Sequence, residues 1–125
     1  MKHYGRTDAN HKAIVGELRH HFYVDDHAAT GGGRPDLLCV YRRVTVFVEL
    51  KHGKQSVLTK QQLKWIGEFP GHVGFATTAE EAIRLVKEPE TYALTPKQKD
   101  ILLMLWAMCD TPKIHFETVK KKLGL

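Results

Sequence analysis

The sequence predicts a small α/β fold with a mixed sheet, in the order helix, strand, strand, helix, strand, helix, followed by a helical hairpin. Two short runs rich in Val, Leu and Phe stand close together at residues 36–41 and 44–51 and are typical of strands. Three threonines are each followed, three positions later, by Gln or Glu, which is a helix-start signal. At 125 residues the chain is long enough for one compact core.

The first predicted helix covers residues 8–22, with Asp8 as its N-cap. Apolar residues recur along it at helical spacing, so one side of the helix is expected to face the core. This stripe consists of Ile14, Val15, Leu18 and Phe22.

A loop rich in glycine is predicted at residues 27–34, and the strands 36–41 and 44–51 follow it. Arg42 and Arg43 stand between the two strands as a tight connection. They lack the Asn-Gly signal that is typical of a two-residue turn. An antiparallel hairpin is nevertheless the expected arrangement.

The remaining helices are predicted from their capping signals. The pairs are Thr59 with Gln62, Thr78 with Glu81 and Thr95 with Gln98. The first predicts a helix that begins near Lys60, and the second a helix that follows a third strand at residues 72–77. Pro96 then occupies the first turn of the helix that the third pair begins.

The chain is predicted to divide near residue 88, into a core of residues 1–88 and a helical hairpin of residues 89–125. A hairpin this short cannot bury its apolar face alone. Its apolar face consists of Ile101, Leu102, Leu105 and Trp106. We expect this face to pack on the core or on a second subunit; the alternative is the start of a helix-turn-helix unit.

Composition limits the class of protein. The net charge of +5 favours contact with phosphate backbones, although it also fits ordinary solubility. The sequence has no run of 18 apolar residues and no secretory signal, so neither a membrane partner nor export is expected. Cys39 and Cys109 fit reduced, buried thiols, which favours a cytoplasmic protein. The eight histidines lack the spacing of a zinc site.

The hairpin brings charged residues together. If the two strands pair around the Arg42–Arg43 connection, Asp36 lies directly opposite Glu49, with β-carbons roughly 5 Å apart. Lys51 lies two residues beyond Glu49 and projects from the same face. A loop of odd length would shift this register.

Facing carboxylates repel each other unless a positive charge lies between them. Carboxylate oxygens suit hard divalent cations such as Mg²⁺ or Mn²⁺. Lys51 would then be placed to orient a water molecule or to offset developing charge near a phosphate. The alternative is that Asp36 caps a turn after Pro35, while Glu49 and Lys51 are solvated at the end of a strand.

These residues resemble the motif of the PD-(D/E)xK nucleases. Pro35-Asp36 is followed by twelve residues and then by Glu49-Leu50-Lys51. The preceding glycines and the segment LTKQQLKW at residues 58–65 resemble the VRR-NUC branch, which includes small phage and prophage proteins and is related to Holliday-junction resolvases. The resemblance covers about residues 6–87.

The resemblance implies a restriction-endonuclease-like core that acts on DNA with Mg²⁺ or Mn²⁺. Asp36, Glu49 and the backbone carbonyl of Leu50 would hold the metal. Lys51 would position the attacking water. Gln62 matches an active-site glutamine of the family; the rival interpretation is that it only caps the helix through Thr59.

The first helix departs from the family pattern. The family places a glutamate there, and the position that aligns with it is Ala13. Asn10, Ala13 and Glu17 share one stripe of the helix, so Glu17 could supply the missing carboxylate to the metal and to catalysis. The alternative is a solvated surface residue.

The sequence therefore predicts a divalent-metal-dependent DNA endonuclease, with a junction or flap as a candidate substrate. The glycines at residues 31–33 are expected to leave room for a backbone, such as that of DNA, to approach. The main alternative is a nucleic-acid-binding module with weak or no catalysis on the same scaffold. A third is a subunit whose hairpin docks on a partner. Whether the chain forms a homodimer is left open by the sequence.

Overall fold

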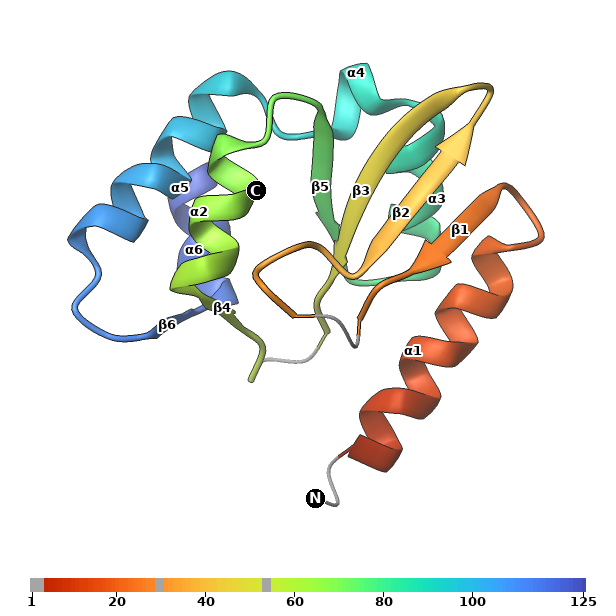
Figure 1. Cartoon of the computed structure of the whole chain (residues 1–125), viewed down its shortest axis with the longest axis horizontal. Coiled ribbons are helices and arrows are strands. Elements are labelled where there is room, and N and C mark those ends of the chain that lie inside the picture. Colours follow the sequence, from red (N-terminus) through yellow and green to blue (C-terminus); the bar gives the residue numbers. More distant parts are fainter. Residues whose placement is uncertain (1–3, 29–30, 53–54) are drawn as a thin grey trace.

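A mixed four-stranded sheet lies at the centre of the molecule (Figure 1). The structure is a computed structural model that describes residues 4–28, 31–52 and 55–125, with the backbone alone for residues 4–9. The strands, in their order across the sheet, are β1 (Tyr23–Asp26), β2 (Leu37–Tyr41), β3 (Val44–Leu50) and β5 (His72–Ala76). β1 and β3 both pair antiparallel with β2, whereas β5 pairs parallel with β3. The predicted α/β class with a mixed sheet is confirmed.

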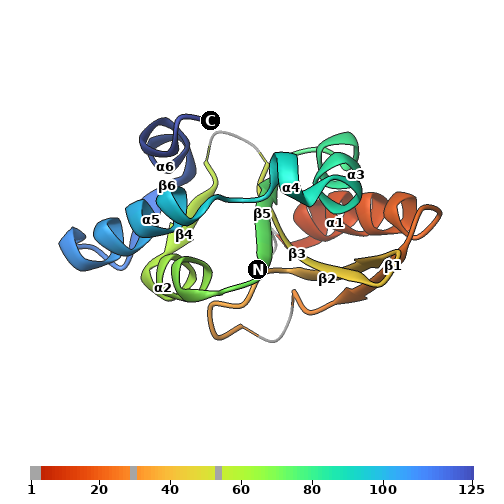
Figure 2. The same cartoon turned by 90° about the horizontal axis from the view of Figure 1, so that it is seen from above.

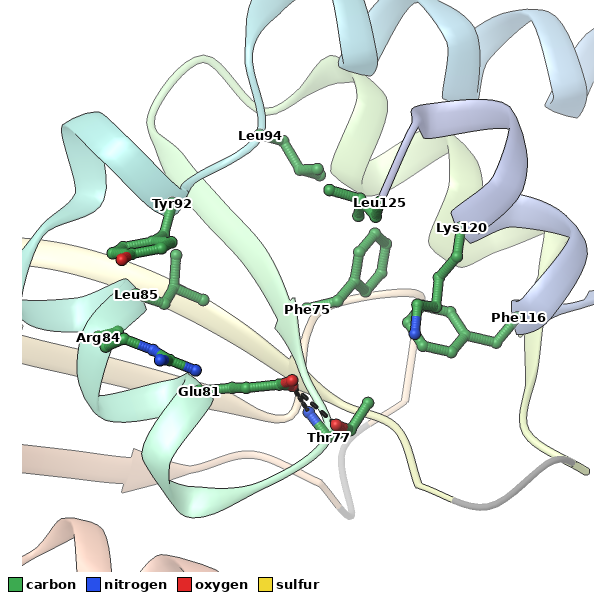
Figure 3. Close-up of a pocket in the computed structure, with 10 residues that line it drawn as sticks. All are labelled: Phe75, Thr77, Glu81, Arg84, Leu85, Tyr92, Leu94, Phe116, Lys120 and Leu125. Atoms are coloured by element: carbon green, nitrogen blue, oxygen red, sulfur yellow. Dashed lines mark hydrogen bonds between the residues drawn. The ribbon is translucent and has the colours of Figure 1, made fainter.

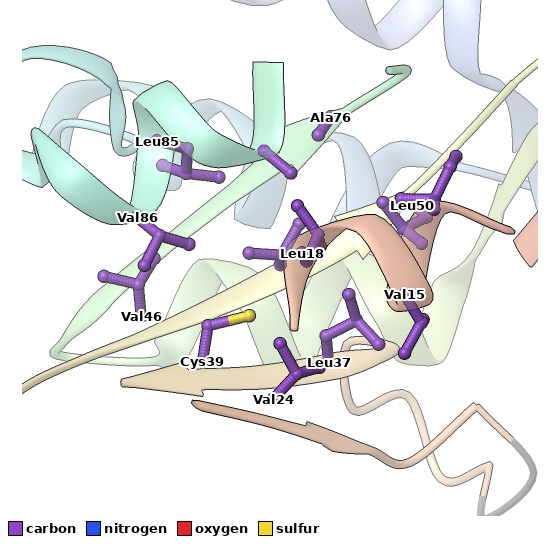
Figure 4. Packing of buried hydrophobic residues seen from close by; sticks show 13 residues of the cluster. Val15, Leu18, Val24, Leu37, Cys39, Val46, Leu50, Ala76, Leu85 and Val86 are labelled. Carbon is purple, nitrogen blue, oxygen red and sulfur yellow. The ribbon is translucent and has the colours of Figure 1, made fainter. Parts of the chain in front are cut away.

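Two helices, α1 (Tyr4–Leu18) and α3 (Ala79–Lys87), cover one face of the sheet (Figure 2). Their buried side chains and those of the strands form one apolar cluster (Figure 4). Its members are Ile14, Val15, Leu18, Val24, Leu37, Cys39, Val46, Val48, Leu50, Ala76, Ala82, Leu85 and Val86. Cys39 is a buried free thiol, as predicted, and burial raises its pKa to about 12. Cys109 is also free and is half-buried.

The helices α2 (Lys60–Glu68), α5 (Pro96–Met108) and α6 (Phe116–Leu123) gather at the other side of β5, as Figure 1 shows. They form a second apolar cluster with the sheet. Its buried members are Leu58, Leu63, Ile66, Val73, Leu94, Leu102, Phe116, Val119 and Leu123. Trp65, Phe69 and Phe47 pack at its edge with ring centroids 4.8 to 5.3 Å apart.

The C-terminal part packs on the rest of the chain through the predicted face. Leu102 is fully buried, and the other three residues of that face pack against the second cluster. The predicted hairpin also contains a strand: β6 (Lys113–His115) lies between α5 and α6 and pairs antiparallel with β4 (Val57–Thr59). This pairing joins the C-terminal part to the segment that precedes α2. The predicted domain boundary near residue 88 stays a prediction.

Several predicted bounds are wrong. The first helix begins at Tyr4 and ends at Leu18, so Asp8 lies inside it and is not its N-cap. Residues 23–26 form the strand β1, which was not predicted because it is short, carries two aspartates and alternates only weakly. The short elements β4, β6 and α4 (Pro89–Tyr92) were also missed.

All three helix-start signals begin a helix where predicted, but only two of them form a complete capping box. Complete capping boxes begin α2 at Thr59 and α5 at Thr95. At α3 the Thr78 hydroxyl accepts the Glu81 N–H, but the Glu81 carboxylate bonds to Thr77 instead of closing the box. In the described part of the chain, none of the helices has the length and apolar character needed to cross a membrane.

Candidate metal centre

The β2–β3 hairpin brings Asp36 and Glu49 together in the predicted register. Leu37 pairs with Val48, and Tyr41 with Val44, so Asp36 stands opposite Glu49. The Asp36 N–H donates to Glu49 Oε1 at 3.2 Å. The Leu50 N–H in turn donates to Asp36 Oδ2 at 3.0 Å. Each carboxylate is therefore held by the backbone of the opposite strand.

Glu49 is buried, with 1% of its surface exposed. Lys51 Nζ lies 2.9 Å from Glu49 Oε2, and Gln62 Nε2 donates to the same oxygen at 2.9 Å. The Lys51 side chain is 13% exposed. An ionised carboxylate is costly to bury, so the surrounding donors are needed to stabilise its charged form.

Gln62 both caps helix α2 and donates a hydrogen bond to Glu49. Its Oε1 accepts the Thr59 N–H at 3.0 Å and completes the capping box of α2. Its Nε2 points to Glu49. Because the capping bond engages the carbonyl end of the amide, the NH₂ end must face the carboxylate. A part for Gln62 in catalysis stays a prediction.

Burial raises the pKa values of both acids. Burial raises the pKa of Glu49 to about 7, the nearby Asp36 charge adds to this, and Lys51 opposes it. Burial also raises the pKa of Asp36, against the hydrogen bond from Leu50 and the charge of Lys51. Such a pair of perturbed carboxyls is typical of functional sites.

The structure does not bring Glu17 into this group. Glu17 and Ala13 are exposed on α1. In the described part of the chain, no hydrogen bond or ion pair joins Glu17 to Asp36, Glu49 or Lys51. Its role as a metal ligand therefore stays a prediction without geometric support.

His11 and Asp26 lie near Asp36 instead, and the sequence reasoning missed them. His11 Nε2 is 2.9 Å from Asp26 Oδ2, and both charges act on the pKa of Asp36, His11 lowering it and Asp26 raising it. His11 continues the buried stripe of Ile14 and Val15 by one turn, and that spacing could have found it. Asp26 could not be placed because β1 was not predicted.

At Gly33 the glycine loop lies against helix α2, whereas a DNA backbone was expected beside the loop. Gly31, Gly32 and Gly33 all have positive φ angles, of 68°, 77° and 85°. A Cβ at Gly33 would lie 2.6 Å from the backbone oxygen of Gln61. Gly33 therefore makes room for the chain's own helix α2, which corrects the expectation of a DNA backbone there. Beside Gly31 and Gly32 the space is open, and the expectation stays a prediction.

A cavity of about 360 Å³ opens at Lys51, and neither Asp36 nor Glu49 lines it. It is lined by Leu50, Lys51, His52, Gln55, Ser56 and Val57. Lys51 therefore both contacts the buried Glu49 and lines this cavity.

The donor set at this site contains only oxygen atoms from two carboxylates. Among the described residues, no group of three His, Cys, Asp or Glu side chains is arranged to hold a metal ion. Mg²⁺ is commonly held by one or two carboxylates, with water and substrate phosphate completing its octahedron. Asp36 and Glu49 fit this kind of ion, since a cation between them would favour the charged form of both carboxylates, which burial disfavours.

Comparisons with known protein families, with curated proteins and with solved structures gave no match to this chain. The resemblance to the VRR-NUC nucleases therefore rests on the motif residues of the sequence and stays a prediction.

Proposed function

We propose that this chain is a divalent-metal-dependent nuclease that hydrolyses phosphodiester bonds of DNA. The observation that carries the proposal is the buried Glu49 carboxylate, 1% exposed, on which Asp36, Lys51 and Gln62 converge. Two facing acids do not stabilise a fold by themselves, so their burial together favours a functional role.

Asp36, Glu49 and the backbone carbonyl of Leu50 would hold Mg²⁺ or Mn²⁺. The chemistry that the ion supplies when bound is Lewis-acid stabilisation of the charge that develops on the phosphate. The protein's part is to hold both carboxylates in one orientation. The backbone N–H groups of Asp36 and Leu50 and the amide of Gln62 do this in the structure.

Lys51 is the residue that would act on the reacting atoms. Its ammonium group lies against Glu49, and the residue also lines the cavity. From there it can orient the attacking water and stabilise negative charge on the phosphate. Water forms a bond to phosphorus, and the bond from phosphorus to the leaving 3′ oxygen breaks.

The charge of the chain suits the proposed substrate. A net charge of +5 favours binding to the DNA backbone.

Free thiols at Cys39 and Cys109 fit a cytoplasmic setting, in a bacterium or in a phage-infected cell. We propose a structured DNA such as a junction or flap as the substrate, and a homodimer would be required for paired cuts.

A second candidate function is a nucleic-acid-binding module without catalysis. The observation that favours it is that Glu49 Oε2 already contacts both Lys51 and Gln62. A metal ion would have to compete with these contacts for the same oxygen. Among the residues that the structure describes, no third acid completes a metal-binding group, and Glu17 lies exposed on α1.

One experiment separates the two functions. Linear, supercoiled and four-way-junction DNA are incubated with Mg²⁺ or Mn²⁺ and with wild type, Asp36→Asn or Lys51→Gln, and with Glu80→Gln as a control for loss of an exposed carboxylate. We expect cleavage that EDTA abolishes and that each site variant lowers on the order of 100-fold, while Glu80→Gln retains it. If wild type cuts none of these substrates although all proteins bind them equally, the nuclease proposal fails and the binding module remains.

A further inference from the structure

A second cavity, of about 320 Å³, lies between α3, α4, α6 and β5 (Figure 3). Its volume is in the range of small-ligand sites, roughly 300–1,000 Å³. Three aromatic rings line it, those of Phe75, Tyr92 and Phe116. Leu85 and Leu94 add to its apolar surface. The cavity therefore suits a flat, largely apolar group.

Charged groups surround the aromatic surface of this cavity. The Arg84 guanidinium lies 5.8 Å from the Tyr92 ring centroid, and Lys120 Nζ lies 5.6 Å from that of Phe116. Glu81 is held in place because its Oε1 accepts both the N–H and the hydroxyl of Thr77, each at 2.7 Å (Figure 3). A ligand with a flat ring, amino groups for Glu81 and phosphate for the two cations would match every one of these groups. A nucleotide has these features.

Phe75 relates the cavity to the candidate metal centre through the sheet. Phe75 pairs with Glu49 in the parallel β3–β5 ladder. Partners in adjacent parallel strands project to the same face, with the strands about 4.8 Å apart. Phe75 packs against the second apolar cluster, on the side where Gln62 of α2 meets Glu49. The cavity therefore lies one strand away from the buried carboxylate.

We infer that this cavity binds one unstacked nucleobase of a DNA strand whose neighbouring phosphate reaches the Asp36–Glu49 site. Arg84 and Lys120 contact the backbone of the same strand, and the rings hold the base by stacking. This inference rests on the proposed nuclease function for its orientation, and it extends that function to a substrate class. A base that is paired within a duplex cannot enter, so the preferred DNA has a single-stranded or unpaired nucleotide next to the cut.

Binding without divalent metal tests this inference separately from cleavage. Fluorescence anisotropy measures the affinity of wild type for a single-stranded oligonucleotide and for a blunt duplex, at equal salt. Tyr92→Ala removes a ring of the cavity and Lys120→Gln removes one cation. The matched controls are Tyr23→Ala, because Tyr23 is 62% exposed on β1 against 47% for Tyr92, and Lys122→Gln on the same helix as Lys120.

We expect the two cavity variants to weaken single-strand binding on the order of tenfold and duplex binding by less than about twofold, with both controls near wild type. Tyr92 is half-exposed, so the variant should fold, and its circular dichroism and melting curve verify this. Equal weakening of single-strand and duplex binding, or the same loss in the controls, overturns the inference.

The same measurements separate the base site from the nuclease proposal. If wild type binds single strands through this cavity but cuts no DNA with Mg²⁺ or Mn²⁺, the base site stands and the nuclease proposal fails. If wild type cuts DNA while both cavity variants bind single strands as tightly as wild type does, the base site is overturned and the nuclease proposal stands.

Discussion

Glu49 is a carboxylate whose surroundings act on it in opposite directions. Burial and Asp36 favour its protonated form, whereas Lys51 and the Asp36 N–H favour the ionised form. The net result is a pKa of about 7 in place of 4.5. The apo protein therefore holds a proton at Glu49 over a pH range in which the unfolded chain has already lost it.

This difference makes the free energy of unfolding depend on pH. Between pH 4.5 and about 7 the folded state binds more protons than the unfolded state, so stability falls as pH rises. The contribution of Glu49 is fully present below pH 4.5 and is lost by about pH 7, a change on the order of 3 kcal/mol. In Glu49→Gln this part of the slope disappears. Urea unfolding of both proteins at metal-free pH 5 and pH 8 measures it, and identical pH slopes in the two proteins would contradict the assignment.

Gly33 is the loop glycine that the fold requires most directly. Ala at this position needs a φ of 85° and places its Cβ 2.6 Å from the Gln61 oxygen. Gly31 also has a positive φ, of 68°, but open space beside it. We expect Gly31→Ala to cost about 1 kcal/mol of unfolding free energy and Gly33→Ala about 2–4 kcal/mol. Chemical denaturation measures both, and equal costs would show that contact with α2 is unimportant.

The β2–β3 turn is the element whose residues are least typical of its backbone conformation. Arg42 and Arg43 both have positive φ angles, of 52° and 71°, as a two-residue hairpin turn of type I′ demands. Arginine is strained in this conformation, whereas Asn and Gly adopt it readily. The buried alternation of the strands on either side compensates for this strain, which is why the hairpin prediction succeeded without its turn signal.

The double substitution Arg42→Asn with Arg43→Gly should therefore stabilise the protein. We expect the unfolding free energy to rise by about 1–2 kcal/mol, less a small loss from the Arg42 contact with the Tyr41 ring at 5.1 Å. Thermal and urea unfolding measure the change. Arg42→Lys with Arg43→Lys is the control, since it keeps the strained backbone and the charge, and a gain of the same size in this control would contradict the explanation.

Helix α2 shows what a local signal can and cannot predict. Thr59 and Gln62 predict where the helix begins, because a capping box depends only on residues that are near in sequence. The same amide reaches Glu49 because β3 and α2 are held together by the second apolar cluster. The approach of Gln62 to Glu49 depends on tertiary packing. Capping of α2 and contact with the site therefore looked like alternatives in the sequence.

At the scale of the molecule, the periodicity of the longer strands and helices was sufficient to predict the α/β class and the mixed sheet. It was not sufficient for β1, β4 and β6, because strands of three or four residues carry too little alternation to be recognised. The register of the hairpin placed Asp36 against Glu49 correctly. The contribution of α1 was expected from Glu17, which is exposed and stays a prediction, whereas His11 is the α1 residue that the structure places near Asp36.

The site also depends on the C-terminal part. α5 packs on α2, and β6 pairs with β4 just before α2 begins. α6 contributes Phe116 and Lys120 to the cavity beside β5. Elements on both sides of the predicted boundary near residue 88 thus hold Gln62 and shape the proposed base site.

Metal binding in the absence of DNA tests the central claim, that Asp36 and Glu49 form a divalent-metal centre. Isothermal titration calorimetry measures Mn²⁺ affinity at pH 6 and at pH 8 for wild type and Asp36→Asn. Since Glu49 must lose its proton to bind the ion and its pKa is about 7, wild type should bind about tenfold more tightly at pH 8 than at pH 6, with proton release. Asp36→Asn should show little binding at either pH. Undetectable binding by wild type, or an affinity that is the same at both pH values and in the variant, would contradict the account.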